Sequence, residues 1–255
     1  TVPESPRWLV KQNKETEARR IIKEVSNADI EQEVHEIRES LVATGNCGEK
    51  LFQRKYRKPI LYAFLIATFN QLSGINAILY YAPRIFEMSG VFTNSAMMQS
   101  IVIGLTNLTF TMIGMILIDQ VGRKKLLYIG SIGMAISLAL VAKGFCQDTF
   151  SGYYMLACLM GFIAFFAISL GAVIWVLISE VFPNSVRSKG QVLGSMTHWV
   201  WSALLSWMFP VFIRTGGTFI FSFFAIMMFL SFFFALRLPE TKNKSLEQIQ
   251  KELTN

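Results

Sequence analysis

Residues 70–76 read Asn70-Gln71-Leu72-Ser73-Gly74-Ile75-Asn76. The stretch places three carboxamides and a Ser-Gly pair inside an apolar segment that covers residues 59–82. At about 1.5 Å per residue, a helix of that length crosses a hydrocarbon core of about 30 Å. Carboxamides at membrane depth are costly unless they meet one another, a second helix or a polar ligand. Because a Ser-Gly pair favours a bend in a helix, the stretch predicts a broken membrane helix beside a solute-binding site.

The composition of the whole chain agrees with a membrane protein. Hydrophobic residues make up 53% of its 255 residues, and the mean hydropathy is +0.43. Apolar runs separated by short loops predict an all-α integral membrane protein with six transmembrane helices, preceded by short cytoplasmic helices. We expect a cytoplasmic linker over 1–58, a six-helix bundle over 59–238 and a cytoplasmic tail over 239–255. The six apolar spans are 59–82, 96–118, 124–145, 153–179, 191–213 and 216–238.

The basic residues predict the orientation of the bundle. All 24 Lys and Arg residues except Arg84, Lys143 and Arg214 fall on the side that also holds both termini. The positive-inside rule therefore predicts cytoplasmic termini, in a multi-pass protein of the cell (inner) membrane. The net charge of +7 then reflects topology, and no nucleic-acid partner is expected.

Patterns that would indicate catalysis are not found in the sequence. Three cysteines without paired spacing and two distant histidines do not make a metal site. There is no nucleophile–base pair and no phosphate-binding loop. We therefore expect neither an enzyme nor a cofactor.

The segment before the first span predicts two short amphipathic helices, over 14–27 and 30–43. The second carries one apolar stripe that we expect to pack against the cytoplasmic face of the bundle. Near the start of the chain, Pro3 and Pro6 exclude a helix interior, and we expect a rigid turn there. The stripe consists of Ile30, Val34, Ile37 and Leu41.

Several later spans also carry polar or aromatic residues at membrane depth. In the second span Asn107 lies on a face of small residues, where a smaller side chain would have served packing better. Trp175 lies inside the fourth span, where its indole N–H needs a hydrogen-bond acceptor. Gly171, four residues earlier, is a candidate hinge point in the same span. His198 in the fifth span shares one helical face with Ser195 and Ser202. An ionisable residue at membrane depth is costly, so we expect this polar face to line a cavity. The Phe-rich sixth span is expected to face lipid.

Charged residues at the helix ends form a second group. Asp119 and Arg123 join the second and third spans, and Glu180 and Arg187 join the fourth and fifth. The positive-inside rule explains why arginines occur at these helix ends, but it does not explain the carboxylates beside them. Ion pairs between these helix ends would hold the cytoplasmic side shut until they break.

Together these segments resemble the sugar porter family of the major facilitator superfamily, which includes facilitative glucose transporters and bacterial sugar–proton symporters. Residues 70–76 resemble the family's seventh-helix motif Gln-Gln-x-Ser-Gly-x-Asn. The resemblance covers essentially the whole chain and implies the C-terminal half of a twelve-helix transporter. The other matching motifs, in the family's order, are Pro3-Glu4-Ser5-Pro6-Arg7, Gly122-Arg123-Lys124, Glu180 through Arg187 and Pro239-Glu240-Thr241.

The resemblance also implies roles for individual residues. Those implied to contact the sugar or line its cavity are Asn70, Gln71, Asn76, Asn107, Trp175, His198 and Trp199. Those implied to act as gates are Tyr80 and Tyr81, together with the charged residues Asp119, Arg123, Glu180 and Arg187. This chain departs from the family pattern at four positions. Asn70 stands for a usual Gln, His198 for Gln or Asn, Ala172 for a frequent Pro, and Ala167 for an acidic residue of some members.

The expected partners follow from this resemblance. They are a monosaccharide (hexose or pentose), membrane lipids, an N-terminal six-helix half that this chain lacks, and protons if the protein is a symporter. Symport is the preferred interpretation. A facilitative uniporter and an inert or sensing half-transporter remain the alternatives.

Overall fold

A computed structural model describes residues 4–25, 30–31, 34–35, 37–38, 50–88, 93–147, 152–183, 185–214 and 216–242. Its packing divides the chain into two units, which we describe separately. The first holds the described residues up to Leu51 together with residues 185–186, and the second holds the remainder. The three-part division expected from the sequence stays a prediction.

The first unit contains α1 (Pro6–Lys11) and α2 (Glu15–Val25). The expectation of a turn without a helix at Pro6 is wrong. Proline occupies the first turn of α1, where its missing N–H costs no intrahelical bond, and Ser5 Oγ caps the helix by accepting from the Trp8 N–H at 3.2 Å. Prolines interrupt helix interiors, whereas this one begins a helix.

The partner expected for the apolar stripe is also different. Val34 and Ile37 are buried in one cluster with Leu9, Val10 and Ile22 of α1 and α2. These residues of the stripe therefore pack within their own unit, whereas we expected them to pack against the membrane bundle. The fourth residue of the stripe, Leu41, lies outside the described residues. On the surface of this unit, Arg38 donates to Glu15, and this hydrogen bond lowers the pKa of the Glu15 carboxyl below its ordinary value.

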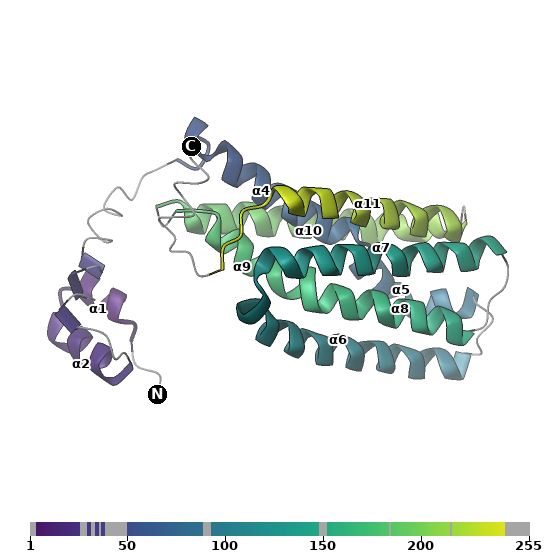
Figure 1. Cartoon of the computed structure of the whole chain (residues 1–255), viewed down its shortest axis with the longest axis horizontal. Coiled ribbons are helices and arrows are strands. Elements are labelled where there is room, and N and C mark those ends of the chain that lie inside the picture. The colour runs from purple at the N-terminus through teal and green to yellow at the C-terminus, as the bar shows by residue number, and fades with distance from the viewer. Residues whose placement is uncertain are drawn as a thin grey trace. The chain divides into compact units, whose positions relative to one another are not determined.

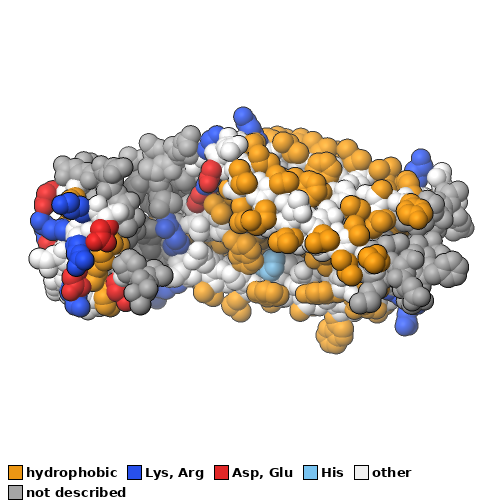
Figure 2. Space-filling view, turned by 90° about the horizontal axis from the view of Figure 1, so that it is seen from below, with side chains coloured by type: hydrophobic (Ala, Val, Ile, Leu, Met, Phe, Trp, Pro, Cys, Tyr) orange, Lys and Arg blue, Asp and Glu red, His pale blue; other side chains and the backbone are white. Residues whose placement is uncertain are grey.

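Within its described residues, the second unit contains six helical segments that are long and apolar enough to cross a membrane, as expected. Figure 2 shows hydrophobic side chains over the flank of this bundle, with Lys and Arg near its two ends. The short η1 (Arg54–Tyr56) precedes α4 (Arg57–Leu72), and two of the six spans are interrupted helices. The remaining helices of the bundle are α5 (Ile75–Met88), α6 (Thr93–Val121), α7 (Arg123–Gln147), α8 (Gly152–Phe166), η2 (Ala167–Gly171), α9 (Ala172–Glu180), α10 (Arg187–Arg214) and α11 (Gly217–Arg237).

The bundle has two packed groups of helices. In one, α7 lies between α11 and α8, and α6 flanks α8 (Figure 1). In the other, α4 packs along α10 and contacts α9. The expectation that the sixth span simply faces lipid is wrong for one side of α11. There, Phe221 and Phe224 are fully buried, and Ser231 lies 3.3 Å from Ser131 of α7.

The first span breaks where the sequence predicts it. Helix α4 ends at Leu72, and α5 begins at Ile75. Gly74 has φ +81°, a conformation that disfavours residues with a Cβ, and a Cβ there would lie 2.5 Å from the Phe224 ring. Ser73 Oγ donates to the Asn70 carbonyl at 2.6 Å and accepts from the Ile75 N–H at 3.3 Å. The break therefore satisfies its own backbone polar groups.

The fourth span carries a second irregularity. Between α8 and α9, η2 is a π-helical turn, the wide i→i+5 form that often marks functional sites. Two glycines on neighbouring helices make room for it. A Cβ on Gly130 of α7 would lie 1.8 Å from Ser169 Oγ, and one on Gly114 of α6 would lie 3.0 Å from the Ile168 Cα.

These contacts predict that Gly130→Ala destabilises the bundle. The added methyl overlaps Ser169, and overpacking of this kind costs about 1–3 kcal/mol. We expect an apparent melting temperature in detergent that is lower by several degrees. The matched control is Gly104→Ala on α6, where a Cβ meets no atom within 4 Å. The control should melt at the same temperature as the parent or slightly above it, and equal melting of both variants would contradict the close approach of α7 and η2.

Candidate functional site

The centre of the candidate site is a group of four hydrogen-bonded polar residues beside the helix break. Gln71 at the end of α4 is almost fully buried, with 1% of its surface exposed. Its Nε2 lies 2.9 Å from Nε2 and 3.2 Å from Nδ1 of His198 on α10. Its Oε1 accepts from Asn76 Nδ2 at 3.1 Å, and the same nitrogen lies 2.7 Å from Ser202 Oγ. We call Gln71, Asn76, His198 and Ser202 the polar cluster.

The helix break and the register of α10 together assemble this cluster. Because α5 starts a new helix after Gly74, Asn76 is turned so that its amide reaches back to Gln71. On α10, His198 and Ser202 are four residues apart and so share one face of the helix. Gln71, Asn76 and His198 are among the residues expected from the sequence to contact the sugar. Ser202 was noticed only as a neighbour of His198, and the i, i+4 spacing was the available signal.

Asn70 lies in a different environment from the cluster. It is buried, and its Nδ2 donates to the Leu170 carbonyl of η2 at 3.2 Å. Its Oδ1 has no hydrogen-bond partner within the described part of the chain. The side chain therefore joins the broken first span to the π-helical turn of the fourth.

Aromatic rings border the polar cluster. The Trp175 ring of α9 lies 5.0 Å from the His198 ring, between centroids, and the Trp199 ring lies 5.4 Å from it. Trp175 is 43% exposed and Trp199 62% exposed. Such rings offer flat apolar faces next to hydrogen-bonding groups, an arrangement that suits a ligand with both C–H surfaces and hydroxyls.

The other expected contact and gate residues lie apart from these contacts. Asn107 of α6 is half-buried and makes no hydrogen bond to any described residue. Tyr81 donates from its hydroxyl to the Ser206 carbonyl at 3.1 Å, and its ring lies 5.2 Å from that of Phe209. Tyr80 is exposed. One of the two tyrosines is thus fixed between α5 and α10, and its neighbour is not.

Ion pairs join the helix ends on the side of the bundle where α6 ends and α7 begins. Arg123 is paired with Asp119 at 3.2 Å and with Glu180 at 3.1 Å, so it links α6 and α7 to the end of α9. Its Nη1 also donates to the Ile118 carbonyl at 3.3 Å. Arg187, expected in the same group, is half-buried at the start of α10.

Glu240 completes this arrangement and was not among the expected site residues. Its carboxylate accepts from the backbone N–H groups of Arg123 at 3.2 Å and Lys124 at 3.3 Å. A carboxylate at a helix N-terminus satisfies donors that have no intrahelical partner. Gly122 makes this approach possible, because a Cβ there would lie 2.9 Å from the Glu240 carboxylate. We call Asp119, Arg123, Glu180 and Glu240 the charged latch.

Comparisons with known proteins agree with this geometry. The family described as "Sugar (and other) transporter" matches residues 1–253. The chain is 38% identical over 254 residues to the arabinose-proton symporter of Bacillus subtilis, covering 98% of this chain and 55% of that protein. It is 35% identical over 259 residues to the D-xylose-proton symporter of Escherichia coli, covering 98% and 52% of the two proteins.

Solved structures give the same result. A proton:xylose symporter of the major facilitator superfamily, solved with 6-bromo-6-deoxy-D-glucose, superposes with a TM-score of 0.84 at 34% identity. The match covers 99% of this chain and 55% of that one. The chain thus spans about half the length of the relatives it matches. The expected fold is confirmed, and the chain belongs to the sugar transporter family, with six membrane helices of the major facilitator type.

Proposed function

We propose that this chain forms half of a transporter that moves a monosaccharide, a hexose or a pentose, by alternating access. The observation that supports this most directly is the polar cluster beside the break between α4 and α5. Its amides, hydroxyl and imidazole lie inside an otherwise apolar bundle, where polar groups are retained only if they are satisfied or bind a ligand. The names of the relatives, an arabinose-proton and a D-xylose-proton symporter, support the same substrate class.

In this proposal, sugar hydroxyls exchange with hydrogen bonds that the cluster makes within itself. Gln71 and Asn76 each offer both donor and acceptor atoms, as a sugar hydroxyl does. Trp175 and Trp199 supply apolar walls, and Asn107 contributes a further amide from α6. Asn70 takes part less directly, because its amide nitrogen bonds to η2. Such a site discriminates strongly, since an unmatched hydroxyl leaves buried groups unpaired.

We further propose that access alternates by rocking of this bundle against an N-terminal six-helix half, with both termini in the cytoplasm. The charged latch then acts as the cytoplasmic gate, to which we also assign Arg187, and the Tyr80–Tyr81 pair as the gate at the opposite end. Each gate contains contacts between separate helices that a relative movement would break. Proton coupling is part of the proposal. In the polar cluster, His198 is the member with an ionisable side chain.

The site assignment predicts loss of sugar affinity in Gln71→Ala and Asn107→Ala. Losing one hydrogen bond to a buried hydroxyl costs about 1–3 kcal/mol, so KM for isotope uptake should rise about 5- to 150-fold. The measurement uses the protein at its full natural length. Gln147→Ala, which removes an exposed amide at the end of α7, is the matched control and should transport normally. Unchanged KM in both site variants would reject the assignment.

Proton coupling predicts that sugar uptake makes the medium alkaline. In reconstituted vesicles, adding sugar outside should raise the external pH as each sugar carries a proton inward, and an uncoupler should abolish accumulation but not equilibration. Uptake that proceeds without any pH change would indicate a facilitative uniporter. Absence of uptake by the full-length protein would favour the inert or sensing alternative.

The latch predicts that Glu240→Gln opens the cytoplasmic side more often. The substitution weakens the bonds to the start of α7, and the closed state loses stability relative to the open one. A cysteine introduced as Ser195→Cys in a cysteine-free background should react several-fold faster with a membrane-impermeant thiol reagent added from the cytoplasmic side. Lys143→Gln, near the other end of α7, serves as the control. Equal labelling rates in the two variants would exclude the gating role of Glu240.

A further inference from the structure

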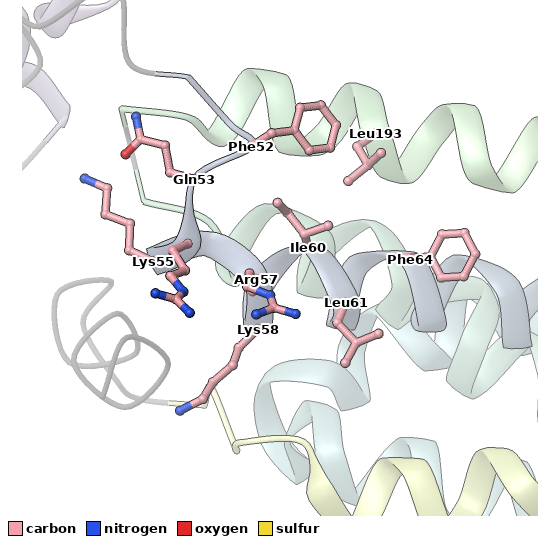
Figure 3. A pocket seen from close by; sticks show the side chains of 10 residues that line it. Phe52, Gln53, Lys55, Arg57, Lys58, Ile60, Leu61, Phe64 and Leu193 are labelled. Atoms are coloured by element: carbon pink, nitrogen blue, oxygen red, sulfur yellow. The ribbon is translucent and has the colours of Figure 1, made fainter.

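A groove of about 960 Å³ runs along the beginning of α4 and is separate from the polar cluster (Figure 3). Its volume lies near the upper end of the range of about 300–1,000 Å³ that is usual for ligand pockets. Lys55, Arg57 and Lys58 lie toward one end of the groove and Phe64 lies at the other. Its apolar wall consists of Phe52, Ile60, Leu61, Phe64 and, from α10, Leu193.

The basic end of the groove carries a local excess of positive charge. Residues 50–86 include no Asp or Glu, and in the described part of the chain Arg54, Arg57 and Lys58 make no ion pair. The first turn of α4 contains Arg57 and Lys58, where the positive end of the helix dipole makes cations unfavourable. A bound anion would relieve the repulsion among the basic side chains and the repulsion between them and the helix dipole.

The apolar wall is exposed although it directly follows this basic end. Phe52 is 79% exposed, Leu61 52% and Phe64 42%. In Figure 3, the Phe52 ring points toward Leu193, and the Ile60 side chain lies below them in the view. Positive-inside flanking accounts for basic residues at a helix end, but it does not account for a hollow with an apolar wall beside them. The combination suits a molecule with an anionic head and a hydrocarbon tail.

We propose that this groove binds an anionic phospholipid. The phosphate lies against Arg57 and Lys58, with Arg54 and Lys55 nearby, and an acyl chain follows Ile60, Phe64 and Leu193 along α4 and α10. Basic pockets between membrane helices bind anionic headgroups in this way. The apolar wall distinguishes this ligand from a soluble phosphate, which would use only the basic end. A groove covered by a protein segment would instead leave no room for the acyl chain.

The experiment measures lipid retention by the full-length protein purified in a neutral detergent. Native mass spectrometry counts phosphatidylglycerol and phosphatidylcholine bound after equal additions of lipids with identical acyl chains. We expect retained phosphatidylglycerol to exceed phosphatidylcholine at least about fivefold, and the excess to disappear in the double variant Arg57→Gln/Lys58→Gln. Both side chains are exposed, so their removal leaves the packed bundle intact. The matched control is Lys143→Gln/Arg214→Gln, which removes two exposed charges elsewhere and should keep the excess.

A second measurement locates the acyl chain. Phosphatidylglycerol with a photoreactive acyl chain should crosslink to peptides that contain Phe64 or Leu193, and Phe64→Ser should reduce that yield severalfold. Glycerol 3-phosphate in large excess should not displace the lipid. Displacement would show that a soluble phosphate suffices, and crosslinks only at other helices would show that another segment fills the groove. Either result, or equal phosphatidylglycerol retention by both charge variants, overturns the proposal.

Discussion

The constraint on which this structure depends is the need to satisfy every polar group inside a membrane without the help of water. A helix that breaks at mid-span frees backbone donors and acceptors, so a break survives only where side chains or an unusual backbone take their place. Here Ser73 bonds on both sides of the break, and Gly74 adopts a left-handed conformation against the Phe224 ring. Gln71 and Asn76 are in turn paired within the polar cluster, and the Asn70 nitrogen bonds to η2.

The first and fourth spans, which are both irregular, satisfy some of each other's polar groups. The π-helical turn interrupts the regular hydrogen-bond ladder of the fourth span, and the Leu170 carbonyl accepts from Asn70 of the first. Glycines on α6 and α7 let the wide turn fit between them. The polar cluster then lies where the first, fourth and fifth spans meet, with tryptophans at its border.

The sequence was informative where a property depends on neighbours along the chain. Apolar length identified the six spans, and the Ser73–Gly74 pair identified the break, because both follow from local chemistry. The sequence was misleading where the contact partner of a residue lies far away along the chain. The stripe containing Val34 packs against α1 and α2, and Asn70 turns to a carbonyl one hundred residues further on. Pro6 was misread because proline disrupts a helix interior but suits its first turn. Glu240 belonged to a recognised motif, yet its role as a cap needs the position of α7, which no local pattern supplies.

The position of Glu240 also has a consequence for biogenesis. The carboxylate that caps α7 follows it by 117 residues in the chain and lies beyond the last span. During synthesis the start of α7 therefore enters the membrane uncapped, and Arg123 reaches its partner Glu180 only after the fourth span has emerged. The charged latch can therefore be completed only after all six spans have been synthesised. A bundle that ended before residue 240 would leave the start of α7 without this cap.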